Sequence, residues 1–335
     1  MRRLLAWILR HKKLSLLILL LALFTALNIS AYLHAHAMTH IAGPGYRTPK
    51  PADLTFLQKV VTLFSGVRIP KTRNWQTPAI LGLPFTTRRI RSEEGLTLEA
   101  WHVAAPGSIG LVLLHHGYAN CKASLVKEAG VFHGMGYETL LVDSRACGGS
   151  DGLITTVGYD EARDVAAAFR YAKGLGVRGP IILFGQSMGA AAVLRAIAEE
   201  GVAPDAAILE CPFNSLLATV KHRFEIMGLP SFPAAHLLVF WGGAQHGFNG
   251  FAHAPEQYAK KVRCPALLLV GAEDRQSTAL EVRSIFENLA GPGQIEVFEG
   301  GGHGDQLSVH PEAWKQAVKA FLRTKLPAGG RVGSR

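Results

Sequence analysis

The chain has few cysteines and fewer acidic than basic residues. Four cysteines among 335 residues are too sparse for a disulfide-dense scaffold, so the hydrophobic core must supply the stability. None of them has the paired spacing of a zinc site, and we expect no metal and no cofactor. Asp and Glu number 25 against 35 Lys and Arg. Outside the N-terminus the basic excess is scattered and no nucleic-acid-binding motif is present, so we expect no nucleic-acid partner.

Charge is also missing from one long stretch near the start of the chain. Residues 14–33 contain no charged side chain, which matches the roughly 20 residues that a helix needs to cross a bilayer. Basic residues lie among the first thirteen positions, and the next one after the stretch is Arg47. The positive-inside rule therefore predicts a cytoplasmic N-terminus, a signal anchor that attaches the chain to the membrane, and an extracytoplasmic domain, periplasmic in a Gram-negative cell.

A cleaved signal peptide is the alternative for this segment. The sequence "AHA" at Ala35–Ala37 resembles a cleavage site, and cleavage there would release a secreted domain that begins at Met38. The apolar stretch is longer than the ~7–15 residues of a signal peptide, which favours the anchor. We expect His34, His36 and His40 to be interfacial residues beside the membrane and not metal ligands.

The rest of the chain alternates between two kinds of pattern. After a turn-rich stalk, whose amphipathic stretch 54–64 is expected to dock on the domain, short apolar runs alternate with amphipathic helical stretches. This predicts a mostly parallel sheet covered by helices on both faces, with two antiparallel strands first. About fifty residues separate two of the apolar runs, which predicts a small cap inserted over the sheet. The expected segments are cytoplasmic 1–13, transmembrane 14–34, stalk 35–80, catalytic domain 81–325 with cap insertion 212–263, and a disordered tail 326–335.

The sequence "GQSMG" at Gly185–Gly189 lies between an apolar run and a helical run. In that context G-x-S-x-G predicts a nucleophile elbow, in which Ser187 sits on a strained turn and projects its hydroxyl above the sheet. Gly185 and Gly189 are small because the backbone is crowded there. The helix that follows points its N-terminus at a developing oxyanion, and we expect the backbone N–H of Met188 to be one donor. The alternative interpretation is a turn that serves only packing.

A serine nucleophile needs a base, and the base needs an acid that orients it. After this elbow the acid comes next in the chain and the histidine last. Asp274 follows one apolar run and His303 follows the final one. Both are therefore expected at the carboxyl edge of the parallel sheet, where Ser187 lies.

Several alternatives stay open around this triad. Glu273 and Glu210 are alternative acids, and His310 is an alternative base, although its place before a helical pattern favours a role at a helix start. The second oxyanion donor is expected in the loop "HHGY", as the backbone N–H of Tyr118. The two histidines of that loop are expected to be structural.

These motifs, in this order, resemble the α/β-hydrolase superfamily. The matching stretches are "HHGY", "GQSMG", "GAED" and "GGH". The stretch "VDSRACGGSDG" is similar to the family's D-x-R-G-x-G-x-S-x-G segment, from which Ala146 and Cys147 depart. "GYDEARDVAAAFRYA" resembles the next helix of membrane-anchored and dipeptidyl-peptidase-like members. The resemblance covers about residues 80–325, and it implies the α/β-hydrolase fold, with strand order 1-2-4-3-5-6-7-8.

The sequence thus predicts a serine hydrolase that cleaves a small-molecule acyl substrate, foremost a carboxylic ester, through an acyl-enzyme. A peptidase or amidase of the same fold and a non-catalytic binding protein on this scaffold are the alternatives. In the cap, four aromatic residues form either a mini-core or the wall of an acyl pocket; they are Phe240, Trp241, Phe248 and Phe251. Cys121 and Cys147 follow strands that the implied order makes neighbours, which permits a disulfide between them. Free thiols that pack as small apolar groups are the other interpretation.

Overall fold

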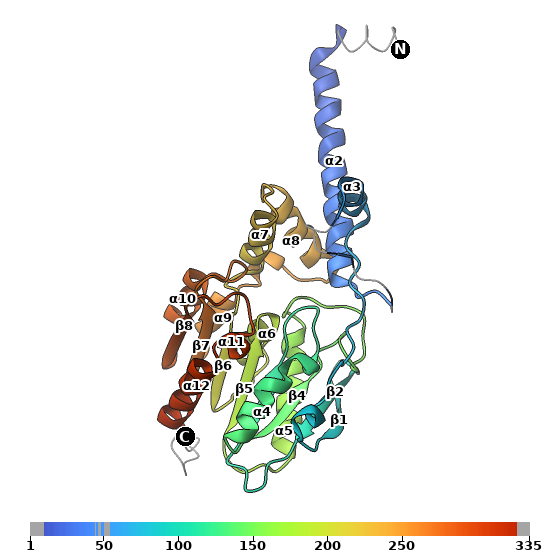
Figure 1. Ribbon diagram of the computed structural model, residues 1–335. Helices are drawn as coiled ribbons and strands as arrows, with labels where there is room; N and C mark the ends of the chain where they lie inside the picture. Colours follow the sequence, from blue (N-terminus) through green and yellow to red (C-terminus); the bar gives the residue numbers. More distant parts are fainter. Residues whose placement is uncertain (1–9, 44, 46–47, 50–53, 327–335) are drawn as a thin grey trace.

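The computed structural model describes residues 10–43, 45, 48–49 and 54–326. Its centre is an eight-stranded sheet of order β1-β2-β4-β3-β5-β6-β7-β8 (Figure 1). The β1–β2 and β2–β4 pairs are antiparallel and the remaining pairs are parallel, which confirms the predicted fold class and strand order. The strands are β1 (Thr86–Arg91), β2 (Thr97–Val103), β3 (Leu111–His115), β4 (Glu138–Val142), β5 (Ile181–Gln186), β6 (Ala206–Glu210), β7 (Ala266–Gly271) and β8 (Gly293–Phe298).

The central strands are apolar on both faces because helices cover both. In β3 every residue is buried; Leu111 and Leu113 join one hydrophobic cluster, whereas Val112 and Leu114 join the other. This alternation is the two-residue period of a strand. Helices α5, α6, α9 and α10 cover the first face, and α4, α11 and α12 cover the second. Their bounds are α4 (Val126–Gly134), α5 (Glu161–Gly174), α6 (Met188–Glu199), α9 (Pro255–Ala259), α10 (Ala279–Glu287), α11 (Gln306–Val309) and α12 (Pro311–Lys325).

Two helices form a cap at the carboxyl edge of the sheet, between β6 and β7. They are α7 (Leu216–Ile226) and α8 (Ala234–Gln245), followed by the short 3₁₀ helix η4 (Gly250–Ala252). The side chain of Ser215 caps α7 by accepting the N–H of Ala218. In Figure 1 the cap lies on the side of the domain from which the N-terminal helix projects.

The N-terminal helix α2 (Lys12–Thr39) is unbroken over 28 residues. Within the described part of the chain, it is the helix whose length and apolar composition suffice to cross a membrane. Its first half is exposed, and its second half packs against α8. The indole of Trp241 donates to the Asn28 side chain at 3.2 Å, and its ring meets Tyr32 edge-on at 5.4 Å. The amide of Gln245 donates to the Tyr32 carbonyl at 3.1 Å.

The segment after α2 wraps around the domain. Ile41 donates its N–H to the Leu153 carbonyl at 2.7 Å, and its side chain packs with Ile69 and Ala146. Helix α3 (Phe56–Ser65) packs against α2 and not on the domain as expected (Figure 1). The short 3₁₀ helices η2 (Pro78–Leu81) and η3 (Lys122–Leu125) complete the elements. Most of the predicted cytoplasmic segment and all but the first residue of the predicted tail lie outside the described residues.

Candidate active site

The turn between β5 and α6 places Ser187 in a strained conformation. Its φ is 51° and its ψ is −112°, a region that side-chain-bearing residues rarely adopt. Its N–H donates to the Glu210 carbonyl at 2.8 Å, which ties the turn to the neighbouring strand. A Cβ at Gly185 would lie 2.6 Å from the Gly189 backbone, and a Cβ at Gly189 would lie 2.2 Å from the His115 carbonyl oxygen. Close packing therefore requires both glycines of the elbow.

Three loops at this edge bring Ser187, His303 and Asp274 into one line of hydrogen bonds. The Ser187 Oγ lies 3.0 Å from His303 Nε2, and His303 Nδ1 lies 2.8 Å from Asp274 Oδ2. Asp274 is 4% exposed, and its other oxygen accepts the N–H groups of Gln276 and Ser277 at 2.8 and 2.9 Å. Because a carboxylate only accepts hydrogen bonds, the proton of a neutral His303 sits on Nδ1. Nε2 is then left to accept the serine hydrogen.

The alternative catalytic residues lie in other surroundings. Glu273 is exposed beside the buried acid. Glu210 is buried, but its carboxylate accepts the indole N–H of Trp314 at 2.9 Å and the amide N–H of Gln186 at 3.1 Å. His310 precedes the first residue of α12. Among the three candidate acids, only the predicted aspartate contacts the candidate base.

The electrostatics of His303 depend on its two acidic neighbours. Burial lowers the pKa of His303, whereas Cys211 and Asp274 raise it, and the net direction is upward. Burial raises the pKa of the Cys211 thiol, which keeps it neutral at neutral pH. The persistent anion beside the imidazole is therefore Asp274. Within the described residues these three could offer donor atoms to a metal, but both His303 nitrogens already face Asp274 and Ser187.

The loop after β3 passes directly beside the nucleophile. A Cβ at Gly117 would lie 3.6 Å from the Ser187 Cβ, so the backbone at this point borders the reacting centre. His116 holds the loop: its Nε2 accepts the Ser144 N–H at 3.1 Å, which leaves the proton on Nδ1 to be donated to the Gly117 carbonyl at 2.8 Å. Burial lowers the pKa of His116, and the neutral ring fits this arrangement. The residue therefore has a structural role, as expected.

The neighbouring residues of this loop have distinct surroundings. The Tyr118 hydroxyl donates to the Met38 carbonyl, so the loop is fastened to the end of α2. The Tyr118 side chain also lines the cavity at the site. His115 is buried with no hydrogen-bond partner for its ring nitrogens, and burial lowers its pKa to about 3. A permanently neutral ring in the core is structural, in line with the sequence expectation.

Comparison with known proteins identifies the family. The model of the alpha/beta hydrolase family matches residues 111–320. The chain belongs to the alpha/beta hydrolase family. It is 25% identical over 236 residues to the uncharacterized protein YqkD of Bacillus subtilis, covering 70% of this chain and 77% of that protein. It is also 25% identical over 264 residues to the lysophosphatidylserine lipase ABHD12 of Macaca fascicularis, covering 70% of this chain and 64% of the lipase.

Solved structures of related proteins share the fold of this hydrolase. The esterase Pf2001 of Pyrococcus furiosus has a TM-score of 0.64 and 25% identity, covering 76% of this chain and 96% of the esterase. The acylaminoacyl peptidase of Pyrococcus horikoshii has a TM-score of 0.57 at 18% identity, covering 76% of this chain and 43% of the peptidase. The second likeness concerns the fold alone. Esterases and lipases thus stand among the relatives of the chain.

A cavity of about 590 Å³ opens beside Ser187 in this hydrolase. Its volume is in the range of small-molecule sites. Apolar walls come from Val157, Met188 and Phe213. Residues with ionisable side chains also line it, from both the domain and the cap; they are Lys127, Glu128, Arg223 and Asp305. The site can therefore accept a substrate that has both apolar and polar parts.

The four cap aromatics do not line this cavity, so the acyl-pocket wall, one of the two interpretations of them, does not hold. Trp241 contacts α2, as described above. Phe248 stacks on Tyr159 with ring centres 4.1 Å apart. Phe240 and Phe251 are 50% and 43% exposed, and neither lines the cavity. The reason is that α8 turns Trp241 toward the N-terminal helix and not toward Ser187.

The possible disulfide between Cys121 and Cys147 is not formed. Cys121 and Cys147 are both buried free thiols. The Cys121 thiol donates to the Arg73 carbonyl at 3.4 Å, so its sulfur is engaged by a different segment. Burial raises the pKa of Cys121 to about 11 and raises that of Cys147 as well. Both side chains therefore pack as small neutral groups, which was the alternative expectation.

One cavity residue carries no signal in the sequence. Glu128 lies on α4, is 2% exposed, and its Oε2 has no hydrogen-bond partner. Burial and the nearby Glu210 raise its pKa to about 8. At neutral pH the cavity wall therefore contains a protonated carboxylic acid. Its position within an ordinary helical pattern gave no indication of this role.

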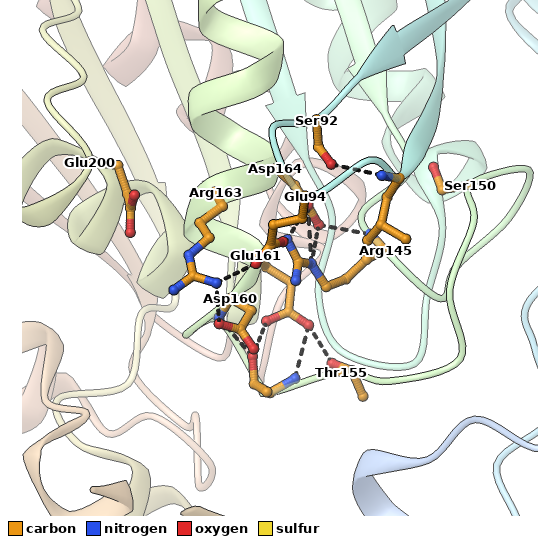
Figure 2. Close-up of polar contacts among 12 residues, drawn as sticks. Ser92, Glu94, Arg145, Ser150, Thr155, Asp160, Glu161, Arg163, Asp164 and Glu200 are labelled. Atoms are coloured by element: carbon orange, nitrogen blue, oxygen red, sulfur yellow. Dashed lines mark hydrogen bonds and ion pairs between the residues drawn. The ribbon is translucent and has the colours of Figure 1, made fainter. Parts of the chain in front are cut away.

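A cluster of buried ion pairs and hydrogen bonds holds the loop between β4 and α5 (Figure 2). Arg145 donates to both oxygens of Asp164, at 2.8 Å from Nη2 to Oδ1 and at 3.1 Å from Nε to Oδ2, and also pairs with Glu94. Glu161 accepts the Thr155 hydroxyl at 2.6 Å, the N–H and hydroxyl of Thr156, and the N–H of Gly158. Since residue 157 lines the cavity, this cluster shapes the site without touching Ser187.

Proposed function

We propose that this alpha/beta hydrolase is a serine esterase that acts through the triad Ser187, His303 and Asp274. The observation that carries the proposal is the chain of hydrogen bonds from the Ser187 Oγ to His303 Nε2 at 3.0 Å and on to Asp274 at 2.8 Å. A hydroxyl becomes a nucleophile only when a base accepts its proton, and a third group must hold that base in the correct tautomer. The elbow places this hydroxyl at the wall of a cavity large enough for a substrate.

The proposed reaction has two steps with the same residues. As Ser187 Oγ attacks the acyl carbon, His303 Nε2 takes its proton, and the imidazolium is stabilised by Asp274. The negative carbonyl oxygen accepts hydrogen bonds from the N–H groups of Met188, at the start of α6, and of Tyr118. The imidazolium gives its proton to the leaving alcohol, and the acyl group stays on Ser187. Water then attacks the acyl-enzyme with His303 as the base, and the acid is released.

Ester hydrolysis is favoured over amide hydrolysis by the relatives. A lipase and an esterase each share 25% identity with this chain, whereas the peptidase shares only the fold. The mixed apolar and charged lining of the cavity suits an ester with an apolar acyl chain and a polar leaving group.

We further propose that α2 anchors the enzyme in a membrane, with the N-terminus in the cytoplasm and the catalytic domain on the other side. The features of α2 support an anchor over a cleaved signal peptide. The "AHA" stretch lies inside the helix, and Ala35 is only 4% exposed. The contacts of Asn28 and Tyr32 with the cap would be lost on cleavage at Ala37.

The esterase proposal is tested with a fluorophosphonate probe and a panel of chromogenic substrates. We expect the wild type to be labelled at Ser187 and to cleave p-nitrophenyl esters at least a hundredfold faster than aminoacyl anilides. Ser187→Ala should fold normally, resist labelling and lose at least about a thousandfold in kcat, by the logic of the triad. Labelling and turnover that survive in Ser187→Ala would rule out the elbow serine. Faster cleavage of anilides would point to a peptidase.

A further inference from the structure

The cap has an exposed surface that is apolar and free of charge. From Ile226 to Pro255 the chain contains no Asp, Glu, Lys or Arg. Large apolar side chains are exposed over this stretch, which includes the loop between α7 and α8. We call the following residues the cap surface: Ile226, Met227, Leu229, Phe232, Phe240 and Phe251. An apolar cluster of this kind marks contact with a membrane or another apolar partner.

The position along α2 at which α8 packs determines how deep the cap surface lies in the bilayer. An apolar segment that spans a ~30 Å hydrocarbon core from Leu14 ends near Leu33. At 1.5 Å per residue, Asn28 lies only ~21 Å along this path. Yet Asn28 is the residue that accepts the indole N–H of Trp241 at 3.2 Å. Five residues separate Asn28 from Leu33, so α8 contacts α2 about 7 Å inside the hydrocarbon core, measured from the end of the apolar segment.

The polar atoms of Asn28 fit this depth. Its Oδ1 accepts the Trp241 indole, and its Nδ2 donates to the Phe24 carbonyl at 2.9 Å. Polar groups inside hydrocarbon need protein partners because water is absent there. Tryptophan itself is enriched at the membrane interface. The contact between α2 and α8 is thus of a kind that is stable at the edge of a bilayer.

Resting on the proposed anchor and the proposed esterase activity, we propose that the cap surface is immersed in the leaflet into which α2 extends, and that the ester substrate enters from this leaflet. A depth of about 7 Å matches the ~5–10 Å to which interfacial helices bury their apolar faces. The occupant of the surface is lipid because the surface is continuous with α2, whose apolar side chains are exposed along residues 14–27. Figure 1 shows α7, α8 and the projecting part of α2 on the same side of the domain.

One face of α7 leads from this surface to the nucleophile. Thr219 and Arg223 line the cavity beside Ser187. Met227 follows at the next i+4 position, so it lies on the same face, and it belongs to the cap surface. An amphiphilic ester whose tail lies in the leaflet could therefore place its ester group in the cavity along this face. The substrate class is a membrane-soluble ester with a polar head.

Site-specific fluorescence quenching tests the immersion independently of activity. The full-length chain with Cys264→Ser, which removes the partly exposed native thiol, carries an environment-sensitive fluorophore at Leu229→Cys or at Ile109→Cys. These positions are 51% and 53% exposed, and residue 109 lies at the amino edge of the sheet, opposite the cap. In vesicles with nitroxide-labelled lipids we expect at least about 50% quenching at 229 and little at 109. Equal quenching at the two positions, or none at 229, overturns the proposal.

An activity measurement tests the substrate route. Leu229→Asp should lower the cleavage of a long-chain ester embedded in vesicles at least tenfold and leave the cleavage of soluble p-nitrophenyl acetate unchanged. Ile109→Asp, the matched control, should alter neither. Equal loss on both substrates, or no loss on the embedded ester, would contradict the route. If the wild type cleaves neither ester, the esterase proposal fails, and the quenching measurement still decides whether the cap is immersed.

Discussion

At the scale of single residues, the candidate site depends on which groups share protons with His303. Asp274 fixes one nitrogen at 2.8 Å and is itself held by two backbone N–H groups. The neighbouring Glu273 is also a carboxylate, but it is exposed and does not contact His303. The order of the motifs was enough to predict Ser187 and His303. The choice between the adjacent acids Glu273 and Asp274 requires knowing which side chain points toward the histidine.

Replacement of Asp274 by Asn should impair catalysis and move its pH dependence. The amide cannot hold the imidazole in the correct tautomer, so kcat should fall by about 10³–10⁴-fold. Asp274 raises the pKa of His303, and only the neutral imidazole accepts the serine proton. The variant should therefore reach its remaining activity at a lower pH than the wild type. The measurement is kcat/KM for p-nitrophenyl acetate against pH, with Glu273→Gln as the control that keeps the wild-type profile. A larger loss in Glu273→Gln would reassign the acid.

Replacement of Glu128 by Gln should stabilise the protein in a pH-dependent way. The pKa of this carboxyl is raised from 4.5 to about 8, so the unfolded chain ionises first and folding stability falls as pH rises between these values. The loss of folding free energy amounts to about 3 kcal/mol at pH 7. Gln does not ionise, so the variant avoids this loss. Urea unfolding in detergent at pH 5 and pH 7 measures the difference. The exposed Glu287→Gln should show no such gain, and equal stability of wild type and Glu128→Gln at pH 7 would contradict the expectation.

At the scale of secondary-structure elements, the cavity wall depends on the loop between β4 and α5. Arg145 fixes this loop from inside by its contacts with Asp164 and Glu94 (Figure 2). Ala146, which departs from the glycine of the family segment, has a φ of 63° and packs with Ile41 and Ile69. The methyl group that strains the backbone therefore also joins the loop to the segment after α2.

Removal of Arg145 should destabilise this element strongly. Arg145→Ala leaves the fully buried Asp164 without its partner, which costs about 3–5 kcal/mol of folding free energy. Arg163→Ala serves as the control, because that side chain is 44% exposed and its pairs contribute less than about 1 kcal/mol. In urea unfolding, the midpoint of Arg145→Ala should therefore lie well below that of Arg163→Ala. A loss of similar size in both would show that the buried pair is not what holds the loop.

The elements differ in how far the sequence could predict them. The strands, the elbow and the positions of Ser187 and His303 were predictable because each signal is local and the parallel sheet brings the strand ends to one edge. The contact of Trp241 with Asn28 joins residues 213 positions apart. The periodic pattern of neither helix predicts this contact. The same reason explains why the sequence left two places open for the four cap aromatics, a mini-core and the cavity wall. A cluster of aromatic residues indicates burial, but it does not indicate against which element.

At the scale of the whole molecule, helix α2, the cap and the site form one connected body. Trp241 joins α8 to α2, and the Tyr118 hydroxyl joins the loop beside Ser187 to Met38. Two independent contacts thus fix the sheet edge that carries Ser187 relative to the proposed anchor. No flexible linker separates residue 28 of α2 from the cap that it supports.

This rigid connection has a kinetic consequence. An enzyme on a long tether samples the bulk solution, whereas one fixed at this height meets substrate by lateral diffusion in two dimensions. Its turnover should therefore follow the mole fraction of ester in the bilayer and not the ester concentration of the suspension. Dilution of the ester with inert phospholipid, at constant total ester, should lower the rate in proportion. A rate that stays constant under such surface dilution would mean that the active site is supplied from the aqueous phase.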